Sequence, residues 1–94
     1  MNNSTVLITG ANRGLGLEFV RQYSQLGWLV LACSRDPSKA SELKVLQEEH
    51  SSIEIFQLDV EKLNEIESLS NTLKDRTIDI LINNAGIYRS GSLG

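Results

Sequence analysis

The 94-residue sequence is poor in cysteine, histidine and proline, each of which occurs once. A single cysteine cannot form an intrachain disulfide, and without a group of Cys and His residues no common structural metal site is expected. Cys33 ends an apolar run, 28–33, where we predict a small buried hydrophobic side chain, with a redox-active thiol as the alternative. His50 lies among acidic residues and serines, so we expect it to be solvated rather than catalytic.

Long apolar runs and surplus positive charge are missing as well. The first apolar run, 6–8, is short and follows no basic segment, so we expect neither a signal peptide nor a membrane span and predict a cytoplasmic location. Nine basic against twelve acidic residues leave a net charge of −3, which disfavours nucleic acid and anionic membranes as partners. Shares of 40% hydrophobic and 22% charged residues are typical of a globular protein, either one small domain or a piece of a larger one.

Short apolar segments alternate with longer amphipathic ones along the chain. The apolar runs predict strands at 5–8, 28–33, 53–58 and 78–82. Three helices are predicted between them, the first over 14–26 and ended by Gly27, the second from an Asp36 N-cap and Pro37 towards His50. Apolar residues at helical spacing support two of these predictions. In the first helix they are Leu15, Phe19, Tyr23 and Leu26, and in the third helix Leu63, Ile66, Leu69 and Leu73.

This β-α-β-α-β-α-β order predicts an α/β fold with a parallel sheet and helices on both faces. Right-handed crossovers restrict the topology, and the doubly wound arrangement gives the strand order 3-2-1-4 with a nucleotide at the carboxyl ends of the strands. Residues 87–94 show no periodicity and are interpreted as a loop.

Glycines dominate the segment between the first strand and the first helix, residues 9–16. Glycine allows a sharp turn and lets backbone approach a phosphate, and the helix that follows directs N–H groups and its positive dipole end at a pyrophosphate. The spacing of Gly10, Gly14 and Gly16 differs from the general dinucleotide fingerprint and from a P-loop. The alternative is a turn used only for close helix–strand packing. We expect Gly14 to tolerate no side chain, because backbone would approach the phosphates there.

Three motifs together resemble the short-chain dehydrogenase/reductase family. The segment 9–16 matches the cofactor motif of that family, Asp59-Val60 matches the pair beside the adenine ring, and residues 83–86, Asn-Asn-Ala-Gly, match the landmark after the fourth strand. Residues 33–37 further resemble the carbonyl-reductase and C-signal-like branch. The resemblance implies that residues 1–94 are the N-terminal part of a dinucleotide-binding Rossmann domain, incomplete relative to the family.

Cofactor choice depends on the residues after the second strand. By the spacing of the family, the carboxylate of NAD-binding members falls at Ser34, and Arg35 follows, where it would hold a 2′-phosphate together with Arg13. We therefore predict NADP(H) rather than NAD(H). Two alternatives exist for the arginines: both are solvated surface charges, or Arg35 pairs with Asp36. Asp36 could also be read as the acid that binds the ribose, although its place before Pro37 better fits an N-cap.

The predicted cofactor-binding residues come from all three motifs and from the end of the second strand. They are Gly10, Asn12, Arg13, Gly14, Leu15, Gly16, Ser34, Arg35, Asp59, Val60, Asn84, Ala85 and Gly86. Two of these positions have alternatives: Asp59 as the N-cap of the third helix, and Asn84, with Asn83, as a turn former.

The catalytic Tyr-x-x-x-Lys motif of the family does not occur, because neither Tyr23 nor Tyr88 has a lysine four residues on. We assign no catalytic residue and expect the 94 residues alone, as a truncated form, to be inactive. An intact form is expected to transfer a hydride between NADPH and a small carbonyl or alcohol substrate. The alternatives are a non-catalytic dinucleotide-binding module, a degenerate short gene product, or a remnant that binds nothing.

The strand predicted at 78–82 is expected to form an unprotected edge of the sheet. Asp79 is its only charge, and it contains no proline or lysine that would block pairing with another chain. We therefore expect self-association through this strand.

Overall fold

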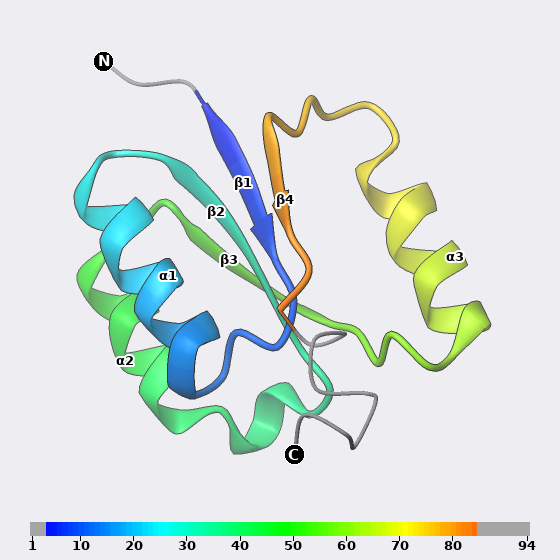
Figure 1. The fold of residues 1–94 in the computed structure, drawn as a ribbon, viewed down its shortest axis with the longest axis horizontal. Helices are drawn as coiled ribbons and strands as arrows, with labels where there is room; N and C mark the ends of the chain where they lie inside the picture. Colours follow the sequence, from blue (N-terminus) through cyan, green and yellow to red (C-terminus); the bar gives the residue numbers. More distant parts are fainter. Residues whose placement is uncertain (1–3, 85–94) are drawn as a thin grey trace.

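Four parallel strands form a single sheet in a computed structural model that describes residues 4–84. The strands are β1 (Thr5–Ile8), β2 (Leu29–Ser34), β3 (Ile53–Gln57) and β4 (Ile80–Ile82), in the order β3-β2-β1-β4 (Figure 1). Helices α1 (Gly14–Gln25) and α2 (Ser41–Glu49) cover one face, and α3 (Leu63–Leu73) lies on the other. The predicted strand order and the helices on both faces are confirmed.

The two faces of the sheet carry separate cores, as alternation along a strand requires. Val6 and Ile8 of β1 pack with Val20 of α1 and with leucines of α2, whereas Leu7 packs with Cys33 and with Leu73 of α3. Parallel register, with Leu7 opposite Leu31 in β2 and Leu81 in β4, brings the carboxyl ends of the strands to one edge of the sheet.

Cys33 lies in β2 and is fully buried, as predicted. Because burial penalises the thiolate, it raises the pKa of the Cys33 thiol to about 12. A thiol in this environment is protonated at neutral pH, which argues against the redox-active alternative.

The helix predicted from Asp36 to His50 is not continuous. Residues Pro37–Lys39 form a separate 3-10 turn, and α2 begins only at Ser41, because Ala40 (φ −92°, ψ 63°) leaves the helical region. Asp36 does act as an N-cap, but of this turn, since its carboxylate accepts the backbone N–H of Ser38 at 3.2 Å. The turn brings Lys39 to the edge of the sheet where the strands end.

The first helix is present, and of the four residues whose spacing predicts it, Phe19 and Tyr23 pack against the core, whereas the two leucines do not. Gly16, Val20 and Ser24 form the buried face, while Leu15 and Leu26 are 50% and 66% exposed. Small residues at intervals of four allow α1 to lie close against the sheet. In α3, Leu69 and Leu73 reach the core, whereas Leu63 and Ile66 at its start are exposed.

The fourth strand is shorter than predicted, and Asp79 precedes it. The backbone N–H of Asp79 donates to the carbonyl of Thr5 at 2.9 Å, and the Asp79 carboxylate accepts the N–H of Thr5 at 2.8 Å. The one charge of this segment therefore closes the end of the β1–β4 pair. Among residues 4–84, no helix is long and apolar enough to cross a membrane.

Candidate functional site

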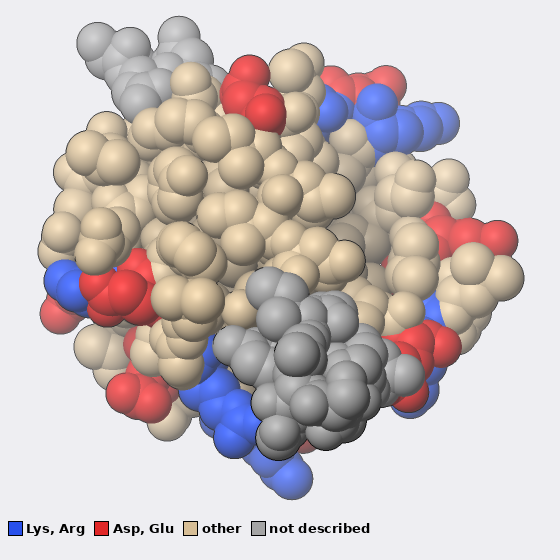
Figure 2. All heavy atoms as spheres, viewed as in Figure 1, with Lys and Arg blue, Asp and Glu red and all other residues tan. Residues whose placement is uncertain are grey.

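A cleft of about 1050 Å³ lies at the edge of the sheet where the parallel strands end. Ten of the residues that the sequence predicts for cofactor binding line it: Gly10, Asn12, Arg13, Gly14, Leu15, Ser34, Arg35, Asp59, Val60 and Asn84. Gly16 is buried in α1 and does not line the cleft, and Ala85 and Gly86, like the predicted loop 87–94, fall outside the described residues. In the view of Figure 2, Lys and Arg side chains gather at the lower edge, near the connection between β2 and α2 in Figure 1.

The glycines of the turn have two different structural reasons. Gly10 and Gly14 adopt φ values of 61° and 57°, a left-handed conformation that side chains disfavour. A Cβ added at Gly14 would meet no atom of the chain within 4 Å, so this glycine borders open space. A Cβ at Gly16 would lie 2.1 Å from the carbonyl oxygen of Gly10. Close packing therefore explains Gly16, whereas at Gly14 the backbone conformation demands glycine and the predicted approach of phosphates stays a prediction.

The N-terminus of α1 meets the cleft without a compensating side chain. Arg13 is its N-cap in an extended conformation, its side chain makes no capping hydrogen bond, and no acidic residue occurs in the first turn. The positive end of the helix dipole therefore borders the cleft together with the side chain of Leu15.

Asn83 and Asn84 connect the end of β4 to the glycine turn, which is more than a turn former would do. Thr9 Oγ1 donates to Asn83 Oδ1 at 3.0 Å, and Asn84 Nδ2 donates to the carbonyl of Gly10 at 3.1 Å. Asn84 is 95% buried, yet its Oδ1 accepts no hydrogen bond. Buried acceptors of this kind are rare, and this one belongs to a residue that lines the cleft.

The end of β2 forms another wall of the cleft. Ser34 is buried, and its carbonyl accepts the N–H of Leu58 at 2.9 Å, which connects β2 to the end of β3. Arg35 is exposed, and within residues 4–84 no ion pair involves it or Arg13. The Asp36 carboxylate bonds instead to the hydroxyl and N–H of Ser38, and the hydroxyl contact lowers the pKa of Asp36. The alternative pairing of Arg35 with Asp36 is thus wrong.

Asp59 follows β3 by two residues and does not cap α3. The N-cap of that helix is Lys62, because the chain makes one further turn in which the carbonyl of Asp59 accepts the N–H of Lys62 at 2.9 Å. The Asp59 carboxylate accepts the N–H of Glu61 at 3.0 Å within this turn. The N-cap alternative is therefore wrong, and Asp59 and Val60 both line the cleft.

Sequence reasoning missed several residues of the cleft, namely Asp36, Lys39, Leu58 and Glu61. Lys39 belongs to no motif and reaches the site only because the 3-10 turn follows β2 so closely. Across the described part of the chain, no group of three or more His, Cys, Asp or Glu side chains could hold a metal ion.

With this geometry established, residues 4–93 match the family described as short chain dehydrogenase. The chain belongs to that family. A short-chain dehydrogenase/reductase of Saponaria officinalis is 41% identical over 87 residues, which make up 86% of this chain and 29% of the relative. The (+)-neomenthol dehydrogenase of Arabidopsis thaliana is 40% identical over 88 residues, 86% of this chain and 30% of the relative.

Solved structures share the same fold. A carbonyl reductase from Pseudomonas aeruginosa in complex with NADP superposes with a TM-score of 0.78 at 30% identity, over 83% of this chain and 34% of that structure. A short-chain dehydrogenase/reductase from Burkholderia multivorans with bound NADP gives 0.79 at 31% identity, over 85% of this chain and 35% of that structure. The chain thus spans about a third of the length of the relatives that it matches. This agrees with the predicted resemblance to the N-terminal part of the family.

Proposed function

We propose that this chain binds NADP(H) in the cleft at the carboxyl ends of its strands. In this proposal it is the nucleotide-binding part of an oxidoreductase that transfers a hydride between NADPH and a carbonyl or alcohol substrate. The observation that carries the proposal is the convergence of the uncapped α1 N-terminus with Arg13 and Arg35, which form no ion pair among the described residues. Two solved family members with this fold hold NADP, which supports the same ligand class here.

The residues of the cleft fit the polar groups of a dinucleotide. A pyrophosphate would lie over Gly14, where no side chain intrudes and the helix dipole favours negative charge. The unpartnered Asn84 Oδ1 offers a buried acceptor to a hydroxyl or amide donor of the ligand. The volume of about 1050 Å³ suits a dinucleotide-sized ligand, since ordinary ligand pockets reach about 1,000 Å³.

The end of β2 favours a 2′-phosphate over a free ribose hydroxyl. Ser34 offers no carboxylate to repel the phosphate, and Arg35 is exposed beside it. Arg13 and Lys39 line the same cleft and add positive charge. Asp59 and Val60 would lie beside the adenine ring.

When bound, NADPH supplies the hydride for reduction of a carbonyl. In this proposal the residues that line the cleft bind and orient the cofactor, and none of them is assigned to proton transfer. A small carbonyl or alcohol compound is the proposed substrate class of the whole protein.

Calorimetric titration with NADPH and with NADH tests the proposal. A charged hydrogen bond contributes about 1.5–3 kcal/mol, so Arg35→Ala should weaken NADPH binding about ten- to a hundredfold and leave NADH binding nearly unchanged. Arg21→Ala is the matched control, because Arg21 is an exposed arginine of α1 that pairs with Glu18 rather than lining the cleft. Equal losses for the two cofactors would refute the 2′-phosphate role, and a protein that binds neither would refute the function.

A further inference from the structure

Glu65 of α3 contacts the backbone of the segment that we place beside the adenine ring. Its Oε1 accepts the N–H of Asp59 at 2.8 Å, although Asp59 precedes it by six residues. We propose that Glu65 is a positioning residue for Asp59 and Val60, which it holds in the orientation that receives the adenine end of the cofactor. This inference rests on the proposed cofactor function and adds to it a residue that touches neither the cleft nor the ligand.

Both backbone groups of Asp59 are held by the start of α3. Its carbonyl accepts the N–H of Lys62 at 2.9 Å, and its N–H donates to Glu65. Glutamate at the third position of a helix ordinarily reaches back to the N–H of the N-cap. Here the N-cap is Lys62, and the carboxylate reaches three residues further to the loop. Glu65 therefore adds a contact from α3 to the hydrogen bonds that the loop makes within its own turn.

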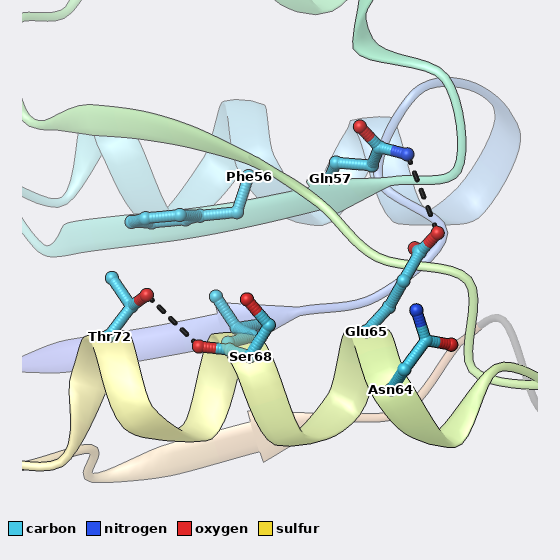
Figure 3. A pocket seen from close by; sticks show the side chains of 7 residues that line it. Phe56, Gln57, Asn64, Glu65, Ser68 and Thr72 are labelled. Atoms are coloured by element: carbon cyan, nitrogen blue, oxygen red, sulfur yellow. Dashed lines mark hydrogen bonds between the residues drawn. The ribbon is translucent and has the colours of Figure 1, made fainter.

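The Glu65 carboxylate has two further polar neighbours at longer distance. Figure 3 shows it rising from α3 towards Gln57 at the end of β3, and Gln57 Nε2 lies 3.5 Å from its second oxygen. Lys62 Nζ lies 4.0 Å from the same oxygen. The Glu65 side chain is only 18% exposed, at one end of a groove of about 350 Å³ between β3 and α3. Partial burial between β3 and α3 limits the orientations open to this side chain.

Amide hydrogen exchange tests the contact without any ligand. In Glu65→Ala the Asp59 N–H loses its acceptor and should exchange about tenfold faster or more. Glu65→Gln keeps a carbonyl acceptor and should retain most of the protection. Glu67→Ala removes an exposed carboxylate from the same helix and should leave the Asp59 amide unchanged. Unaltered Asp59 exchange in Glu65→Ala would overturn the proposal.

Titration with NADPH and with adenosine 2′,5′-diphosphate then separates positioning from general stability. At a temperature where circular dichroism shows every variant to be folded, Glu65→Ala should bind both ligands about three- to tenfold more weakly, because both contain the adenine end. Glu65→Gln should restore the affinity to within about twofold, and Glu67→Ala should not change it.

The outcomes distinguish this inference from the function on which it rests. If the wild-type protein binds both ligands and Glu65→Ala binds them equally well, Glu65 is merely structural and the positioning role is refuted alone. If the wild-type protein binds neither, the proposed function is refuted and the positioning role with it. Faster Asp59 exchange in Glu65→Ala, together with a loss of affinity in that variant that Glu65→Gln restores, would support the proposal.

Discussion

Replacing Gly16 with alanine places a methyl group where the closest packing of the glycine turn leaves no room. The new Cβ would lie 2.1 Å from the carbonyl oxygen of Gly10, 2.8 Å from its carbonyl carbon and 2.9 Å from Asn84 Nδ2. Two of these contacts involve atoms of the Gly10 backbone, so rotation of a side chain cannot relieve them. We expect α1 to move away from the turn by about 1 Å, since ordinary contact begins near 3.4 Å.

The expected change in the free energy of unfolding combines two costs and one gain. Overpacking of a closely packed interior costs about 1–3 kcal/mol, and loss of the Asn84–Gly10 hydrogen bond adds about 1 kcal/mol. Alanine in place of glycine within a helix returns about 1 kcal/mol. We therefore expect Gly16→Ala to destabilise the fold by about 1–3 kcal/mol and to weaken NADPH binding as well, because Asn84 is displaced.

Urea unfolding followed by circular dichroism measures the change in the free energy of unfolding caused by Gly16→Ala, and Gly14→Ala is the matched control. At Gly14 the methyl group meets nothing within 4 Å, and only the φ of 57° opposes it, at about 1–2 kcal/mol. Gly14→Asn should cost less, because asparagine tolerates this conformation. A Gly16→Ala protein as stable as the wild type or more so would refute the packing argument.

Further predictions concern stability, reactivity and association. A hydrogen bond from the Arg76 guanidinium lowers the pKa of Glu54 below its usual 4.5. Arg76→Ala should therefore lower the free energy of unfolding at pH 7 by at most about 1 kcal/mol, because the pair is partly exposed. In unfolding measurements the difference between variant and wild type should vanish as the pH falls well below 4.5, where Glu54 is protonated. Buried Cys33, with a pKa of about 12, should resist alkylation until denaturant unfolds the protein; rapid labelling of native protein would contradict its burial. Light scattering should detect self-association of the 94-residue chain, and Leu81→Lys should reduce it. Leu81 is 65% exposed on β4, and within residues 4–84 no strand flanks the outer side of β4. The same sample should not oxidise NADPH with a carbonyl substrate, since Tyr-x-x-x-Lys is absent from the 94 residues.

The exposed apolar surface around β4 gives the association prediction its physical basis. Ile78, Ile80 and Leu81 are between 36% and 65% exposed. Figure 2 shows few charged side chains in the middle of the visible face, and most of the charged side chains lie at the margins of that face. A monomer across micromolar concentrations would refute the predicted association.

Local sequence patterns suffice for the order of the elements and the topology of the sheet. Alternating apolar runs and amphipathic segments reflect the periods of strands and helices, and right-handed crossovers then leave few arrangements. The position of the glycine segment between β1 and α1 likewise locates the cleft, because strand ends of a parallel sheet meet at one edge.

Contacts between distant segments determine what those patterns leave open. Glycine spacing does not reveal that Gly16 packs against Gly10 while Gly14 borders the cleft, since the difference depends on where the Gly10 carbonyl lies relative to α1. The N-cap signal of Asp59 likewise competes with the extra turn that Glu65 stabilises from six residues away. Local propensities are worth a few tenths of a kcal/mol to about 1 kcal/mol each, whereas close packing and buried hydrogen bonds between elements outweigh them. For this reason the sequence alone identifies the family of the fold and the place of its site, and the packing of α1 and α3 against the sheet sets which side chains that site contains.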